Sequence, residues 1–301
     1  SDLLSSGGRI EGTNDLLWVA SGAATGHTVK IEYSPDGGST NWMLLTNGIA
    51  ASSGAWSWNT TTVPDSPMGL WRVTSEDDPS VSDTSDFIFS VRNAPILFYV
   101  NDLSTAGDVY AAAVGDGMND GLSPSTPQSS VQYILDTYDL EPGDTVYVDA
   151  GNYTLVAPIY ISMFDSGSTG SLMVVQGSTS DVNRTIFTLY GSANGFYLDQ
   201  AVGLGLRNMI VRNASAVGIY LYFAKYCHAE WMTAEACYDG FQMIAGTSNR
   251  LHHCVARGNS HYGVANNGAS GTEWRNGVIW SNLTGISVQG GSIRVENSVI
   301  G

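Results

Sequence analysis

The sequence predicts an all-β protein in which an N-terminal β-sandwich is followed by a coil of short parallel strands. The first observation is a repeat: towards the C-terminus, a glycine followed by a bulky apolar residue returns every 22 or 23 residues. A repeat this short cannot bury a core alone, so its copies must stack as a solenoid. The second observation is composition, since 35 of the 301 residues are glycine and only 13% are charged. The repeated pairs are Gly195-Phe196, Gly218-Ile219, Gly240-Phe241, Gly263-Val264 and Gly285-Ile286.

Alternation within each copy indicates strands with one buried face. The first and third residues after each glycine are nearly all apolar, whereas the second and fourth are mostly polar or aromatic. This period of two predicts that the residues directly after the glycines form one inward stack, from Phe196 to Ile286. A second strand later in each copy predicts a second inward stack. Its members are Ile210, Met232, Val255, Val278 and Val299.

One copy of the repeat carries a family resemblance. The segment Asn208-Met-Ile-Val-Arg-Asn213, followed by Gly218-Ile-Tyr-Leu221, resembles the repeat of the right-handed parallel β-helix in the pectate-lyase-like superfamily. The resemblance implies that residues 94–301 form such a β-helix. It implies little about chemistry, because one fold hosts many functions.

The N-terminal residues 1–93 are predicted to form a separate immunoglobulin-like β-sandwich. Strand-like runs alternate there with turn clusters such as Ser34-Pro-Asp-Gly-Gly-Ser-Thr40. The order of Trp18, Trp42 and Trp71 around these runs resembles the small Kre9/KNH-type module of bacterial surface and secreted proteins. In so small a module we expect most tryptophans to lie in the core rather than on a sugar platform. The expected strands are 16–20, 28–33, 42–46, 55–58, 69–74 and 87–91.

The second domain is predicted to open with a strand and a short capping helix within residues 94–143. Val131, Ile134 and Leu135 recur at helical spacing, with Ser129 or Ser130 available as the N-cap. The coils then occupy residues 144–301 and stop inside a coil, so we expect the chain to be truncated at its C-terminal end. An uncapped coil exposes strand edges, and we expect it to bind another copy or the continuation of the same chain.

Composition disfavours several classes of partner. A net charge of −16 argues against nucleic acid and anionic membranes, which both reward a basic surface. There is no run of 18 apolar residues, so no membrane insertion is expected. The three cysteines do not repeat at the coil spacing and are expected to be buried thiols. Scarce lysine and a surface rich in Ser, Thr, Asn and Gly indicate an extracellular or cell-surface protein.

The second strand also predicts a polar column across the coils, and Glu230 and His253 interrupt its asparagines. Stacked asparagines can hydrogen-bond one another and tolerate left-handed backbone at a tight turn. Glu230 and His253 fall on neighbouring coils about 4.8 Å apart. They are expected to form a structural pair, and the alternative is a general acid and base. The column is Asn208, Glu230, His253, Asn276 and Asn297.

The outward face of the strand after each glycine offers a candidate carbohydrate-contacting surface. Tyrosines pack on the C–H faces of sugars while amides bond to hydroxyls. Aromatic packing under a loop is the alternative. The candidate residues are Tyr197, Tyr220, Tyr222, Asp199, Gln242 and Asn267.

A cofactor is not expected, although calcium stays an alternative. The lyases that the β-helix resembles use calcium held by clustered acids together with a Lys or Arg base, and no acidic triad occurs on one strand here. Asp116 and Asp120 lie in a loop with a faint likeness to a calcium loop. Met118 occupies a ligand position and no Glu closes the loop, so a solvated turn is expected.

Two functional hypotheses follow. The first is a non-catalytic extracellular module of a larger bacterial protein, serving as a scaffold, assembly or glycan-contacting element. The second is a polysaccharide lyase or glycoside hydrolase with its groove on the β-helix. Scarce acid clusters favour the first, and the frequency of polysaccharide-cleaving enzymes among proteins of the resembled fold favours the second.

Overall fold

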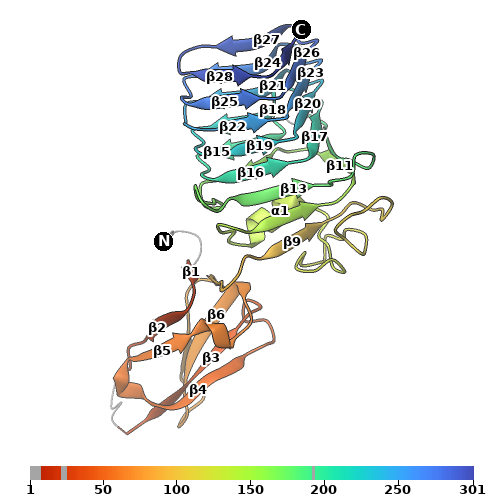
Figure 1. Cartoon of the computed structure of the whole chain (residues 1–301). Helices are drawn as coiled ribbons and strands as arrows, with labels where there is room; N and C mark the ends of the chain where they lie inside the picture. The colour runs from red at the N-terminus through yellow and green to blue at the C-terminus, as the bar shows by residue number, and fades with distance from the viewer. Residues whose placement is uncertain (1–7, 22–25, 192–193) are drawn as a thin grey trace. The chain divides into compact units, whose positions relative to one another are not determined.

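The computed structural model describes residues 8–21, 26–191 and 194–301. The chain divides into two compact units, the first ending at Ile96 and the second beginning at Leu97. Figure 1 shows both, with the first unit in red to orange and the second in yellow to blue. Among the described residues, no helix is both long and apolar enough to span a bilayer.

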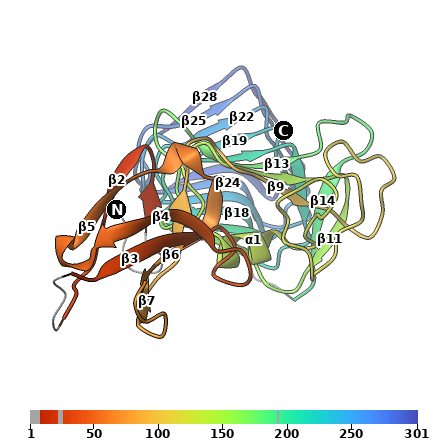
Figure 2. The same cartoon turned by 90° about the horizontal axis from the view of Figure 1, so that it is seen from below.

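The first unit is an immunoglobulin-like β-sandwich. Its larger sheet has the order β1-β8-β6-β3-β4, with β7 paired to β6, and its smaller sheet pairs β2 with β5. The two strands of the smaller sheet lie side by side in both views (Figure 1 and Figure 2). The strands are β1 (Arg9–Ile10), β2 (Thr13–Leu17), β3 (Thr28–Ser34), β4 (Met43–Ala50), β5 (Ala55–Asn59), β6 (Ser66–Ser75), β7 (Ser82–Thr84) and β8 (Phe89–Val91).

Side chains from both sheets form the core of this unit. Tyr33 of β3 and Trp58 of β5 are buried with ring centroids 5.0 Å apart. Three further tryptophans are partly buried against this core, so the prediction that most tryptophans belong to it is confirmed. These three are Trp18, Trp56 and Trp71.

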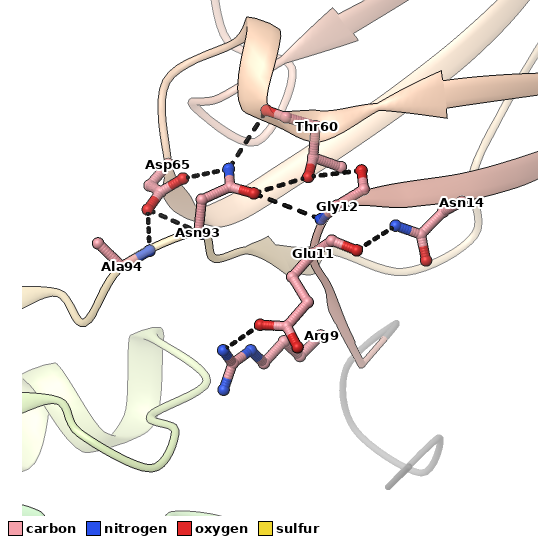
Figure 3. A network of polar contacts seen from close by, with 8 residues as sticks. All are labelled: Arg9, Glu11, Gly12, Asn14, Thr60, Asp65, Asn93 and Ala94. Carbon is pink, nitrogen blue, oxygen red and sulfur yellow. Dashed lines mark hydrogen bonds and ion pairs between the residues drawn. The ribbon is translucent and has the colours of Figure 1, made fainter.

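A polar network fastens the end of the last strand of the sandwich (Figure 3). The Asn93 amide nitrogen Nδ2 donates to Asp65 Oδ1 at 2.7 Å, and Asn93 Oδ1 accepts from Thr60 Oγ1 at 2.9 Å. The backbone N–H groups of Asn93 and Ala94 both donate to Asp65 Oδ2. One carboxylate and one amide thus satisfy the backbone where regular pairing stops.

The second unit is a parallel β-helix with three sheets, stacked coil upon coil in Figure 1. Each full coil contributes one strand to each sheet, and every pairing between coils is parallel. The first sheet contains β9 (Leu97–Val100), β10 (Thr145–Val148), β13 (Met173–Gly177), β16 (Leu204–Arg207), β19 (His228–Glu230), β22 (Arg250–His252), β25 (Thr272–Arg275) and β28 (Ile293–Glu296). The second contains β11 (Gly151–Leu155), β14 (Thr185–Leu189), β17 (Met209–Arg212), β20 (Thr233–Glu235), β23 (Val255–Arg257), β26 (Val278–Trp280) and β29 (Val299–Ile300). The third contains β12 (Ile159–Ile161), β15 (Phe196–Asp199), β18 (Val217–Tyr222), β21 (Asp239–Ile244), β24 (Tyr262–Asn267) and β27 (Thr284–Val288).

The predicted inward stack behind the glycines is confirmed in the third sheet. Each member pairs in register with the next, from Phe196 through Ile219 to Ile286. All are fully buried except Ile286, which is half-buried. The glycines themselves are required by close approach, since a Cβ on Gly195 would lie 2.4 Å from the Gly218 carbonyl oxygen of the next coil.

The second predicted inward stack is wrong. Ile210, Val255 and Val278 are in register but half-buried on the outer face, and Val299 is 63% exposed. Met232 points inward, but Thr233 takes its place in the register. The cause is the corner residue between the first and second sheets, which is left-handed and shifts the alternation by one residue. These corner residues are Asn208, Trp231, His253, Asn276 and Asn297, with φ between 48° and 57°.

Within the described ranges there is one α-helix, α1 (Val131–Thr137), and it lies at the first coil, as predicted. Its N-cap is Ser130, whose side chain accepts a hydrogen bond from the Tyr133 backbone. Gln132 bonds through its side-chain amide to the backbone N–H and C=O of Tyr160 on β12, the first strand of the third sheet. The helix therefore satisfies a strand edge as well as covering apolar surface. Seen from below, the loops between β9 and α1 extend towards β11 and β14 (Figure 2).

An asparagine ladder exists, but inside two other corners. Asn249 Oδ1 accepts from the Cys227 backbone and its Nδ2 donates to the Ala224 carbonyl, both at 3.0 Å. Asn259 and Asn282 repeat this arrangement at the corner between the second and third sheets. Cys227 and Cys237 take the places of Asn249 and Asn259 one coil earlier. All three cysteines are buried free thiols, as predicted. Burial raises the pKa of each thiol above its ordinary value.

Candidate functional site

The outer side of the third sheet carries four tyrosines, which we call the tyrosine face: Tyr160, Tyr197, Tyr220 and Tyr222. Tyr160, Tyr197 and Tyr220 lie in register on β12, β15 and β18. Tyr222 lies two residues further along β18, paired with Asp199 of β15. The predicted row is therefore present. It arises because the alternate residues of a strand point to the same side, and parallel pairing aligns them from coil to coil.

The rings of the tyrosine face pack on one another. Tyr197 and Tyr220 are stacked with centroids 5.0 Å apart, and Tyr160 meets Tyr197 edge-on at 5.5 Å. Phe223, which is 44% exposed, extends the cluster by packing edge-on against Tyr222 at 4.7 Å. Stacking covers the facing sides of Tyr197 and Tyr220, so the surface presents ring edges and phenol oxygens more than open ring faces.

Asp199 is the carboxylate of this surface. The Tyr160 hydroxyl donates to Asp199 Oδ2 at 2.7 Å. This hydrogen bond, with burial, raises the pKa of Tyr160 to about 12. Burial likewise raises the pKa of Tyr197 and Tyr220 above the ordinary value. The phenols thus stay protonated at neutral pH and can donate hydrogen bonds.

The amides predicted for this surface lie on the following coils. Gln242 of β21 pairs in register with Tyr220, and Asn267 of β24 pairs with Ile244 in the column of Tyr222. Both are half-buried, and Asn267 Oδ1 has no hydrogen-bond partner among the described residues. The two coils that follow the tyrosine face therefore each add one amide side chain to the same outer surface.

Glu230 and His253 do not form the predicted pair. Glu230 is the last residue of β19 and pairs in register with Arg207 and His252, whereas Trp231 occupies the corner equivalent to His253. Glu230 binds Arg207, with Oε2 3.0 Å from Nε. The His253 ring stacks on Trp231 at 4.2 Å and its Nε2 lies 3.3 Å from Asn276 Nδ2. The prediction failed because the coil from Asn208 to its equivalent Trp231 is one residue longer than the spacing assumed for the polar column, so Glu230 falls at the end of β19 instead of at the corner.

The outer side of the first sheet carries an ionic ladder that sequence reasoning missed. Glu273 Oε1 lies 3.3 Å from Arg275, and its Oε2 lies 3.6 Å from His252 and 3.9 Å from Arg250. Arg275 also binds Glu296 of the next coil at 3.0 Å. The signal was available, because these charges repeat at the coil period on alternate residues of the first sheet. The polar column predicted from the sequence is a different one: Asn208, His253, Asn276 and Asn297 do share a left-handed corner as expected, and only Glu230 is replaced there, by Trp231.

His228 lies on the same side of the first sheet, and its lowered pKa favours the neutral imidazole. It lies half-buried on β19, in register with Gly205 before it and Arg250 after it. Burial lowers the pKa of His228, and the Arg250 guanidinium lowers it further. A neutral imidazole between guanidinium groups can accept a proton, which is the chemistry of a general base.

The weak calcium candidates act as turn caps. Asp116 Oδ1 accepts from the Met118 backbone at 2.9 Å, and Asp120 Oδ1 accepts from the Leu122 backbone and from Thr126 Oγ1. Within the described ranges, no group of three or more His, Cys, Asp or Glu side chains is arranged to hold a metal ion.

Comparison with known proteins agrees with this architecture of three parallel sheets. The family described as "Right handed beta helix region" matches residues 148–300, slightly more than half of the 301 residues. The chain belongs to this family, and the coil is a right-handed parallel β-helix.

One relative and two solved structures are similar to the chain. The protein named "Pectate lyase L" of Paenibacillus polymyxa (strain SC2) is 31% identical over 152 residues, which are 50% of this chain and 32% of that protein. The chain thus spans about a third of that relative's length. The structure of pectate lyase Pel9A aligns with a TM-score of 0.53 at 17% identity, over 68% of this chain and 54% of that one. A rhamnogalacturonan lyase aligns with a TM-score of 0.47 at 14% identity, over 67% of each chain. At such identities the likeness to Pel9A shows the fold alone.

Proposed function

We propose that the β-helix is a non-catalytic module that binds a polysaccharide on the tyrosine face. The observation that carries this proposal is the register of Tyr160, Tyr197 and Tyr220 on successive strands, with Asp199 beside them. Phenol hydroxyls donate to sugar oxygens, a carboxylate accepts from sugar hydroxyls, and ring edges pack against C–H groups. A row of such groups on successive coils, spaced by about 4.8 Å, suits an extended chain more than a single small molecule.

The contacts of Glu230 and His253, the two weak catalytic candidates, support a binding role without catalysis. Glu230 is held by Arg207, and His253 is stacked on Trp231. Glycosidases need two carboxyl groups facing one bond at a defined separation. Asp199, the carboxylate of the tyrosine face, is bound by a phenol, so it serves as a hydrogen-bond acceptor there.

The cellular setting belongs to the same proposal. We infer a secreted or cell-surface protein in which the sandwich, of the Kre9/KNH type, and the β-helix are modules of a larger bacterial assembly. The composition supports this setting, with 13% charged residues and a net charge of −16. Association of the last coil with another copy stays a prediction, and sedimentation velocity over a range of concentrations tests it.

Affinity electrophoresis tests the tyrosine face. Native gels containing polygalacturonate, alginate or a neutral plant glycan should retard the wild type, and a Tyr197→Ala/Tyr220→Ala double variant should migrate as in a gel without glycan. Tyr226→Ala is the matched control, because Tyr226 is 40% exposed at a different corner of the coil. Equal retardation of the folded double variant would show that the glycan binds elsewhere. Release of reducing ends or unsaturated products by the wild type would contradict a binding-only role.

A lyase is the second candidate, favoured by the relative named pectate lyase L and by His228. Elimination from a uronate needs a base for the proton next to the carboxylate and a positive charge to stabilise the anion that forms. His228, with its lowered pKa, and Arg250 lie in register on the first sheet. Unsaturated products formed from polygalacturonate, lost in His228→Ala and retained in Tyr197→Ala, would establish this activity in place of the binding module.

A further inference from the structure

The outer side of the second sheet contains a hollow that belongs neither to the tyrosine face nor to the ionic ladder. It is shallow and open to solvent, has a volume of about 350 Å³, and is lined by residues from three successive coils. The lining residues are Glu235, Ala236, Arg257, Gly258, Trp280 and Ser281. They occupy the ends of β20, β23 and β26 and the corner residues that follow.

Trp280 supplies the apolar part of the hollow. It is the last residue of β26, pairs in register with Arg257, and is 48% exposed. Tryptophan offers the largest apolar ring face of any side chain, and half-exposed rings of this kind contact ligands with one apolar side. On the coil that follows, the residue next to Trp280 is Gly301, whose backbone N–H donates to the Ile279 carbonyl at 2.9 Å. Glycine has no side chain to cover the indole.

The corner beside Trp280 is kept open by small residues. Ala236, Gly258 and Ser281 follow one another on successive coils, all with left-handed backbone at φ of 54°, 61° and 57°. A Cβ placed on Gly258 would meet no atom within 4 Å, so the space above it is free. Larger residues occupy the corner between the first and second sheets, where Trp231 is covered by His253. The space above these small residues, next to Trp280, can therefore admit a flat ring. At Trp231 the corresponding space is occupied on one side by the His253 ring.

An ion pair forms the polar wall. Arg257 Nε and Nη2 both bind Glu235 Oε2, at 2.7 Å and 2.5 Å. Two contacts to one carboxylate fix the guanidinium plane and neutralise its charge. The wall therefore combines N–H donors and carboxylate acceptors with no net charge, which suits pairs of neutral hydroxyl groups. A carboxylate ligand would have to compete with Glu235 for the guanidinium.

We propose that this hollow is a saccharide-binding site for one neutral pyranose residue of an oligosaccharide. The sugar ring lies on the Trp280 indole through its C–H face, and adjacent hydroxyls bond to Arg257 and Glu235. The site is separate from the tyrosine face and does not depend on the function proposed for that face. Its ligand class differs as well, because the tyrosine face carries the unneutralised carboxylate Asp199, whereas this hollow is charge-balanced.

Fluorine NMR of the whole chain labelled with 5-fluorotryptophan tests the site. The sequence has 8 tryptophans, and the Trp280 resonance is the one absent from Trp280→Phe. Titration with xylotetraose or cellotetraose should shift this resonance saturably and leave that of Trp231 in place. Trp231 is the matched control, since it is 54% exposed at the neighbouring corner. Arg257→Ala should weaken the association about fivefold or more, as expected for loss of a charge-assisted hydrogen bond.

Three results would overturn the proposal. The first is a Trp280 resonance unmoved by both neutral oligosaccharides up to their solubility. The second is an equal shift at Trp231, which would indicate non-specific contact with exposed indoles. The third is a stronger response to tetragalacturonate than to either neutral oligosaccharide, which would assign the hollow to acidic sugars. A Tyr197→Ala/Tyr220→Ala variant should leave the Trp280 titration unchanged, so this outcome is independent of whether the tyrosine face binds glycan.

Discussion

At the scale of single residues, Asp165 shows burial and charge acting together on one carboxyl group. Asp165 lies in the loop after β12 and is 9% exposed. Burial raises its pKa to about 7, and the negative charges of Asp139 and Asp136 add to the rise. A backbone hydrogen bond from Leu140 and one from the Ser162 side chain oppose the rise without cancelling it. The folded protein therefore holds this proton far above the usual pH for an aspartate.

The stability of the β-helix should fall as pH rises from about 4 to 7, because the unfolded chain releases the Asp165 proton near pH 4 and the folded chain near pH 7. Asp165→Asn removes this cost. We expect the variant to be more stable than the wild type by about 4 kcal/mol at pH 8 and equal to it at pH 4. Urea unfolding at both pH values measures the difference. Asp181→Asn, a change at an exposed acid, is the control, and a gain from it of the same size would contradict the explanation.

At the scale of elements, the corner between the first and second sheets decides which residues are buried. Period-two alternation correctly predicted the stack beginning at Phe196, because β15 and its equivalents run without a break after each glycine. The same rule failed for the stack containing Ile210, because the left-handed Asn208 separates β16 from β17. Sequence alternation cannot reveal a single left-handed residue when Trp231 and His253 take the same place as asparagine. The tyrosine face was predictable, since it lies on the unbroken strand, and the Glu230 pair was not.

Substitution of two isoleucines distinguishes the observed register from the predicted one. Ile219→Ala should destabilise the fold by about 2 to 5 kcal/mol, because Ile219 is fully buried and its loss leaves a cavity. Ile210→Ala should cost about 1 kcal/mol, because Ile210 lies half-buried on the outer face. Urea denaturation followed by circular dichroism gives both values. An Ile210→Ala loss as large as that of Ile219→Ala would mean that Ile210 belongs to the core.

The interior asparagine ladder should matter more to stability than the exposed asparagine corner. Asn259→Ala leaves the Cys237 N–H and the Ala234 carbonyl without their side-chain partner in a buried corner, and we expect a loss of about 2 to 4 kcal/mol. Asn276→Ala affects an exposed residue at φ 52°, where alanine costs about 1 kcal/mol through backbone strain. Thermal melts of both variants compare the two corners. Equal losses would argue that the ladder contributes no more than the corner backbone.

At the scale of the whole molecule, the chain is two units with separate cores. The sandwich closes around Tyr33 and Trp58, and the β-helix closes around its inward stacks. The repeat and the tryptophan-rich segment allowed both folds to be predicted from sequence, because each pattern repeats over many residues. The ionic ladder left a signal in charges that repeat at the coil period, but the Trp280 hollow could not be predicted, because it depends on coil register, which a one-residue error displaces.

Differential scanning calorimetry should resolve the two units. Unfolding of the whole chain should show two transitions, and residues 1–96 produced alone should melt in one cooperative step near one of them, as expected for a small domain with its own core. Trp58→Ala, which removes a core ring of the sandwich, should lower only that transition. A single transition shifted as a whole by Trp58→Ala would show that the two units unfold together.

The one-residue corners between the first and second sheets also determine where the β-helix tolerates insertions. From β16 onward, an extra residue between the first and second sheets would turn the next strand inside out, so this corner cannot accept insertions without a compensating change. The connection from the third sheet back to the first is different, since residues 162–172 already form a long excursion there between β12 and β13. New loops grafted at that connection, such as at residues 245–248 before the buried Asn249, should leave the inward stacks intact. The coil is thus a scaffold on which binding loops can be lengthened along one side and remain fixed along another.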